Sequence, residues 1–201
     1  MEYITPIVIA LITAIFGPIV VEWVRNKMSK KKDTLGEAIE VNDLVNHQLE
    51  LMMEDLECDR IWLAQFHNGG HFYPTGKSIQ KFSIFYEKTT PEAQPIQHTF
   101  QSIPVSLFPK AISTLYKDGE LSIPTYKEGS ETYDLDIFAR NYCTKSFYMI
   151  AIDDLEGQFI GVIGIAFNEK EHKLSKEEWI FIRQKTGAIG SLLTDYLKKK
   201  K

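Results

Sequence analysis

The sequence is poor in cysteine, with only Cys58 and Cys143 among 201 residues. The two form no CxxC pair and have no cysteine–histidine spacing typical of a zinc site. We therefore expect reduced structural cysteines in a reducing compartment rather than a disulfide framework. The GxSxG, HExxH, GxxxxGK[ST] and GxGxxG motifs are also missing from the sequence, which removes the usual signatures of several enzyme classes. We assign no catalytic residue and do not expect an enzyme.

Positive charge is scarce in the middle of the chain. Residues 33–197 hold 25 acidic and 14 basic side chains, a net charge of -11. The bases concentrate in Arg25–Lys32, which has five, and in Lys198–Lys201, which has four. Nucleic-acid binding needs clustered lysine and arginine, so we expect no nucleic-acid partner. The two basic ends fit an anionic membrane surface better.

No charged residue occurs between Tyr3 and Val21. This run is long and apolar enough to cross a bilayer, with Trp23 where interfacial aromatics sit. We predict a transmembrane anchor over residues 1–24 and a basic juxtamembrane linker over residues 25–34. The bases follow the span, which predicts an outside N-terminus and a cytoplasmic domain at the cell (inner) membrane. The alternatives are a cleaved signal peptide, although the only charged side chain before the run is the acidic Glu2, and a buried core helix.

The remaining chain alternates helical and strand patterns. The sequence predicts a long first helix over 33–57, and a capping box at Ser175 and Glu178 opens a last helix. Asn68-Gly69-Gly70 is a turn signal. Predicted strands are 60–67, 81–88, 120–123, 146–153 and 158–168, and predicted central helices are 105–117 and 134–142. The fold class is therefore α+β, an antiparallel sheet flanked by helices and preceded by one transmembrane helix.

The first helix carries a heptad-spaced apolar stripe. Asn42 lies at an a-type position, where a buried asparagine often fixes the register of a parallel dimer. We predict a homodimer, and the alternative is an ordinary amphipathic helix on its own domain. The predicted interface comprises Leu35, Asn42, Val45, Leu49, Ile189 and Leu193.

Two stretches resemble the GAF domain family, which is also PAS-like in architecture. SFYMIAIDDLEGQFIGVIGIAFNEK resembles the family's closing hairpin, and KLSKEEWIFI resembles the start of its last helix. The resemblance covers residues 35–197, with flanking helices at 35–57 and 175–197 and a basic tail at 198–201. It implies first and last helices together on one sheet face, and a small-molecule pocket on the other.

The resemblance does not identify a ligand. GAF domains bind cyclic nucleotides, bilins, haem or metabolites, and some bind nothing. The cyclic-nucleotide pattern is degenerate here, since Asn168-Glu169-Lys170 is followed only by Leu174 and Glu177-Glu178. Cys143 has no neighbouring histidine that would suit bilin attachment. The cofactor is therefore left unknown.

Candidate pocket residues are aromatic, with a few polar groups that could orient a ligand. His67 and His71 lack a third ligand, so we assign no metal site. Core aromatics and solvated loop residues are the alternative reading of the same positions. The predicted ligand-binding residues are Gln65, His67, Asn68, Phe72, Tyr73, Tyr86, Phe108, Arg140 and Phe147, and Phe100 is a further aromatic candidate.

These patterns lead to three functional hypotheses. The first is a membrane-anchored sensory or regulatory module that binds a small molecule or a partner protein. The second is a ligand-free interaction or assembly protein at the membrane, which would have a filled pocket. The third is an enzyme on the same scaffold, for which we find no catalytic cluster.

Overall fold

The computed structural model describes residues 14, 16–24, 34–71, 75–127 and 132–198. The chain divides after Glu37 into two compact units. In the first, residues 16–24 are helical, and Phe16, Val21 and Trp23 are each more than half exposed. Among the described residues, no helix has both the length and the apolar character that crossing a membrane requires.

Most of the predicted anchor and of both basic ends lies outside the described residues. These are residues 1–13 and 15 of the span, 25–33 of the linker and 199–201 of the tail. The anchor, its orientation and the tail contact therefore stay predictions.

The second unit is built on one antiparallel sheet of six strands, in the order β3-β2-β1-β6-β5-β4. The closing hairpin β5–β6 has the position and pairing that the sequence predicts, from Ser146↔Phe167 to Asp153↔Phe159. The strands are β1 (Arg60–His71), β2 (Ser78–Thr89), β3 (Ile103–Pro104), β4 (Glu120–Ile123), β5 (Ser146–Asp153) and β6 (Phe159–Phe167).

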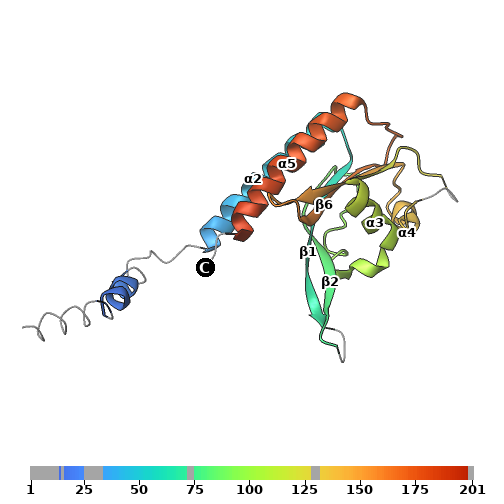
Figure 1. Ribbon diagram of the computed structural model, residues 1–201. Helices are drawn as coiled ribbons and strands as arrows, with labels where there is room; N and C mark the ends of the chain where they lie inside the picture. Colours follow the sequence, from blue (N-terminus) through green and yellow to red (C-terminus); the bar gives the residue numbers. More distant parts are fainter. Residues whose placement is uncertain (1–13, 15, 25–33, 72–74, 128–131, 199–201) are drawn as a thin grey trace, which may run out of the picture. The chain divides into compact units, whose positions relative to one another are not determined.

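Helices cover both faces of this sheet. The long helices α2 (Thr34–Leu56) and α5 (Lys176–Lys198) lie side by side on one face (Figure 1). The opposite face carries α3 (Pro109–Asp118), α4 (Asp136–Asn141) and the short helix η1 (Val105–Leu107). This arrangement confirms the predicted α+β fold with flanking helices.

The start of α5 has the predicted capping box. The Ser175 backbone N–H donates to Glu178 Oε2 at 2.6 Å, and the Glu178 N–H donates to Ser175 Oγ at 3.1 Å. Burial alone would raise the pKa of Glu178, but the hydrogen bonds from Ser175 and His172 outweigh it and lower the pKa. Two otherwise free helix donors are thereby satisfied.

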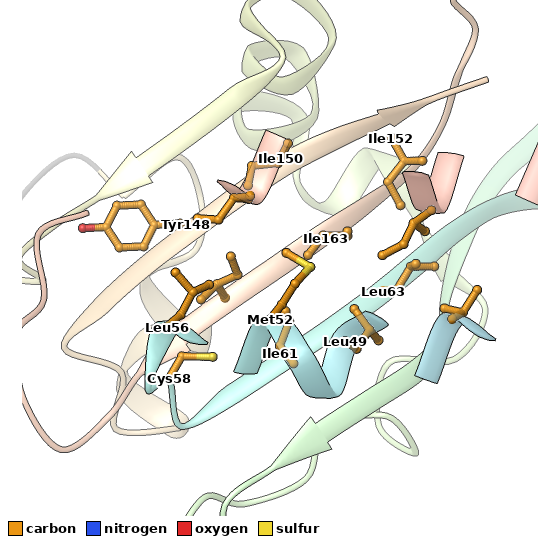
Figure 2. Close-up of a cluster of buried hydrophobic side chains, with 14 of the residues drawn as sticks. Leu49, Met52, Leu56, Cys58, Ile61, Leu63, Tyr148, Ile150, Ile152 and Ile163 are labelled. Atoms are coloured by element: carbon orange, nitrogen blue, oxygen red, sulfur yellow. The ribbon is translucent and has the colours of Figure 1, made fainter. Parts of the chain in front are cut away.

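The core between the sheet and the α2–α5 pair is buried and mostly aliphatic (Figure 2). Its buried members from α2 include Val45, Leu49 and Met52, all 0% exposed. Strand residues that meet them are Ile61, Leu63, Tyr148, Ile150, Ile152, Ile163, Ile165 and Phe167.

This core corrects the predicted dimer interface. Val45, Leu49 and Ile189 are 0% exposed and Leu193 is 1% exposed, so these four side chains are unavailable to a second copy. The heptad stripe faces the chain's own sheet, as an amphipathic helix on its own domain does.

Asn42 and Leu35 also depart from that interface as predicted. Asn42 Oδ1 accepts a hydrogen bond of 2.6 Å from the Tyr86 hydroxyl, so its amide is engaged within the chain. Leu35 is 70% exposed. Of the predicted interface residues, Leu35 alone keeps a largely exposed apolar side chain.

Three local features differ from the sequence prediction. Asn68-Gly69-Gly70 belongs to β1, which continues to His71 with an irregular register against β2. The predicted helix 105–117 is split into η1 and α3, because Pro109 lacks an N–H and begins a new helix. The two-residue strand β3 is too short for a periodic signal.

Candidate functional site

The protein has a second hydrophobic core between the sheet and the layer of α3 and α4, the cavity-face core. The core under α2 and α5 is the helix-face core. A cavity of about 40 Å³ lies in the cavity-face core. Strands β1, β2, β5 and β6 form its floor, and the loop after β2 closes it with Ile96 and Phe100. Its lining residues are Trp62, Ala64, Phe66, Phe82, Ile84, Ile96, Phe100, Phe108, Ala111, Ile112, Leu135, Phe138, Phe147, Met149 and Val162.

Strand alternation explains which side chains reach the cavity. On β1, Trp62, Ala64 and Phe66 line it, whereas Ile61 and Leu63 between them enter the helix-face core. Successive side chains of a strand point to opposite faces. Strand β5 divides in the same way, so neighbouring residues of one strand belong to the two cores.

Aromatic contacts hold the cavity wall. The Phe100 and Phe138 rings meet edge to face at 5.6 Å, and Phe138 lies 5.2 Å from Phe147. Phe82 and Phe108 are 6.0 Å apart. Such tilted and edge-on pairs stabilise the fold beyond the contribution from burying their apolar area.

The side chains that line the cavity are apolar, with one exception. The indole Nε1–H of Trp62 is the polar group of the lining side chains, and it is buried without a hydrogen-bond partner among the described residues. Since one water needs roughly 10–15 Å³, the volume admits about three water-sized groups. As it stands, the cavity is far too small for a bilin, a haem or a cyclic nucleotide.

A buried ion pair stands behind the loop that closes the cavity. Arg60 Nε lies 3.7 Å from Glu87 Oε1, with the two side chains 0% and 5% exposed. The Glu87 carboxylate accepts the N–H groups of Ile96 and Gln97 at 2.8–3.1 Å. Burial lowers the pKa of Arg60, and the Glu87 charge opposes that shift. The pair therefore fixes the loop that carries Ile96 into the cavity.

The cavity brings together only some of the predicted ligand residues. Phe108 and Phe147 line it, as does Phe100. Tyr86 lies on the other face, bonded to Asn42. Phe72 and Tyr73 lie outside the described residues.

The predicted polar groups also lie away from the cavity lining. Gln65 alternates with the lining residues of β1 and so faces the helix side. His67 Nε2 is 2.9 Å from Ser83 Oγ, and Asn68 is exposed beside Gln80. Arg140 is half exposed and paired with Asp136 at 2.7 Å. The cavity as formed therefore does not bring these four side chains into one site.

Most residues of the lining, including Trp62, Phe66, Phe138 and Met149, are not among the predicted ligand-binding residues. The alternation of β1 and β5 could have identified them. Every second side chain of each strand must face away from the long helices and therefore toward the cavity. Arg60 was also missed, although it precedes Trp62 by two positions on the same strand.

Among the described residues, no group of three histidine, cysteine, aspartate or glutamate side chains is placed to hold a metal ion. Cys58 is buried, which raises the pKa of its thiol to about 12, while Cys143 is exposed.

No protein-family model matches this sequence, and no curated protein is similar to it at a significant level. Solved structures do share its architecture. The PixJ GAF domain of Thermosynechococcus elongatus, in its blue-light absorbing form, aligns at 12% identity with a TM-score of 0.63, over 80% of this chain and 89% of its own.

Two further solved structures have comparable likeness. The GAF domain/HD domain protein from Geobacter sulfurreducens aligns at 15% identity with a TM-score of 0.57, over 79% of this chain and 95% of its own. The phycocyanobilin-bound GAF domain from a cyanobacterial phytochrome aligns at 12% identity with a TM-score of 0.59, over 83% and 92%. At these identities the likeness shows the fold alone: the chain has the GAF fold.

Proposed function

We propose that this chain is a regulatory module that senses a small, largely apolar molecule and passes the response to its long helices. The observation that carries the proposal is that one sheet separates the cavity from the helix-face core, so that the same strands supply side chains to both. On β5, Met149 lines the cavity, and its neighbours Tyr148 and Ile150 pack under α2 and α5. Movement of that strand by a bound molecule would shift the helix packing.

The character of the cavity narrows the ligand class. Apolar walls favour a compact hydrocarbon portion, and a cavity of this size excludes large chromophores. The bilin named for a similar structure would need a much larger site with polar partners. We therefore infer a small ligand with at most one polar end.

A thermal-shift panel tests this function. Small apolar compounds should raise the melting temperature of the wild type, and the shift should keep growing with ligand concentration. Ala111 is 0% exposed and lines the cavity, so Ala111→Val should fill space and weaken that shift. If no compound stabilises the wild type, or if Ala111→Val responds equally, the cavity is not a ligand site.

A partner-binding module is the second candidate. Large apolar side chains are exposed on the short helices of the cavity side, with Leu107 60%, Tyr116 75% and Ile137 69% exposed. Tyr116→Ser should reduce capture of a specific membrane-extracted partner, whereas Leu155→Ser in the β5–β6 turn, 68% exposed, is the matched control. Equal capture by both variants would argue against this surface.

Membrane anchoring completes the proposal. The uncharged run Tyr3–Val21 would lie in the inner membrane, with the bases of Arg25–Lys32 and the GAF-fold unit in the cytoplasm. Protease added to intact cells should leave the folded unit uncut and should cut it after permeabilisation. Cutting in intact cells would contradict the proposed anchor or its orientation.

Dimerisation also stays a proposal, on side chains other than those first predicted. Leu44 on α2 is 41% exposed and Ile180 on α5 is 46% exposed. These exposed apolar residues support an interface that leaves the packed core intact. Leu44→Glu should lower the sedimentation mass if Leu44 lies in a dimer interface, and an unchanged mass would exclude Leu44 from it.

A further inference from the structure

Arg60 is a buried cation with unused hydrogen-bond donors. Its side chain is 0% exposed, and its Nη2 donates to the Gln94 carbonyl at 2.6 Å. Nε and Nη1 have no hydrogen-bond acceptor among the described residues. Glu87 does not fill this gap, because it is 3.7 Å from Nε and its oxygens accept two backbone N–H groups. A guanidinium carries five N–H donors, and buried donors are normally paired.

A second unpaired donor lies on the same face of β1. Trp62 follows Arg60 by two residues, so the two side chains project from the same face of the strand. The Trp62 Nε1–H is also buried, and no described residue accepts a hydrogen bond from it. Trp62 lines the cavity, and its indole lies directly over Gly164, where an added Cβ would come within 2.2 Å of the ring. Both side chains therefore have buried N–H groups for which the described residues supply no acceptor.

Tyr142 contacts both Arg60 and the wall of the cavity. The Tyr142 ring lies 5.4 Å from the guanidinium carbon and 5.1 Å from the Phe138 ring. The Tyr142 ring also lies 6.2 Å from the Phe100 ring. Phe138 and Phe100 both line the cavity. Tyr142 therefore connects Arg60 with two residues of the cavity wall.

We propose that the cavity and Arg60 together form a site for a short-chain monocarboxylate. Its carboxylate would accept hydrogen bonds from Arg60 and Trp62, and its apolar tail would occupy the cavity. The tail is limited to about three carbon-sized groups by the 40 Å³ volume. An anionic head suits a buried guanidinium better than a neutral one, because charge-assisted hydrogen bonds are roughly twice as strong. This inference rests on the proposed ligand-sensing function.

The test is a titration of the full chain with isobutyrate, whose isopropyl group has the inferred size. Nitrogen-labelled arginine reports the Nε–H of Arg60, and Arg25, Arg140 and Arg183 are the chain's other arginines. We expect a saturable shift of the Arg60 signal. Isobutyramide, the neutral isostere, should bind roughly tenfold more weakly or worse, the difference that one charge-assisted hydrogen bond supplies.

Variants separate a binding role from a purely structural one. Arg60→Lys keeps the charge and loses the planar donors, so it should weaken isobutyrate binding at least about tenfold. Arg183→Lys, at an exposed ion pair with Glu120, is the matched control and should bind as the wild type does. If Arg60→Lys does not fold, the wild-type titrations with isobutyrate and isobutyramide still decide the question.

Four results would overturn the proposal. They are no saturable shift of the Arg60 signal, equal affinity for isobutyramide, equal affinity for octanoate, and binding of inorganic phosphate in place of isobutyrate. Xenon needs only the apolar space, so it distinguishes failure of the carboxylate site from failure of the ligand cavity itself. Xenon binding in the cavity without isobutyrate binding would reject the carboxylate site and keep the ligand cavity, whereas failure of both would reject the proposed function too.

Discussion

The two faces of the sheet are packed in different ways. The helix-face core is largely aliphatic, and its central residues Leu49, Met52 and Ile163 are fully buried. The cavity-face core is rich in aromatic rings and leaves open space beside the buried Trp62 Nε1–H, for which no described residue is an acceptor. Close packing stabilises a fold, whereas space and unpaired donors cost stability unless something fills them. We infer that the helix-face core mainly stabilises the fold and that the cavity-face core serves the proposed ligand binding.

The largest expected effect comes from truncation on the helix face. Leu49→Ala removes a side chain that is 0% exposed and leaves a cavity under α2. We expect a loss of about 2–5 kcal/mol in the free energy of unfolding, measured by urea denaturation. A loss under about 1 kcal/mol would mean that this core is looser than described.

The close approach of α5 to the sheet gives the next largest effect. A Cβ at Gly190 would lie 2.6 Å from the backbone oxygen of Asp153, so Gly190→Ala should cost about 1–3 kcal/mol. Gly187, in the same helix, has nothing within 4 Å of that position. Gly187→Ala should instead stabilise by about 0.5–1 kcal/mol, since alanine favours helix. Similar effects of both variants in thermal unfolding would contradict the described contact.

The cavity face should respond in the opposite sense to added volume. Ala111→Val places extra methyl groups against open space, so we expect unchanged stability or a gain of up to about 1 kcal/mol. Calorimetry of the ligand-free variant measures this effect. Destabilisation by more than about 1 kcal/mol would mean that this space is already filled.

The smallest effect concerns pH at the start of α5. The pKa of Glu178 is lowered in the folded state, so its stabilising contribution is complete above the unfolded value of about 4.3. That contribution should disappear as the pH falls through the lower folded pKa. Glu178→Gln should flatten this acid-side loss and cost about 0.5 kcal/mol at neutral pH, because the carboxyl is partly exposed. Parallel acid unfolding curves for variant and wild type would argue against this pairing.

The sequence predicted the helix face better than the cavity face, for a physical reason. Periodic spacing identifies long helices and the β5–β6 hairpin, and the Ser175 capping box is local. The cavity collects side chains from strands, short helices and a loop that are distant in sequence, as Trp62, Ile96 and Phe138 illustrate. Tyr86 was misplaced because a register shift after Leu63 sets which β2 residues face the helices. No short pattern reports such a shift.

The proposed function requires that the sheet couple the cavity to the α2–α5 pair. Methyl NMR of the full chain under xenon tests it most directly. We predict shifts at Met149 and Val162 in the cavity wall, together with shifts at Ile150 and Ile163 on the opposite face. Shifts confined to Met149 and Val162 would contradict the coupling and leave a cavity without a route to the helices.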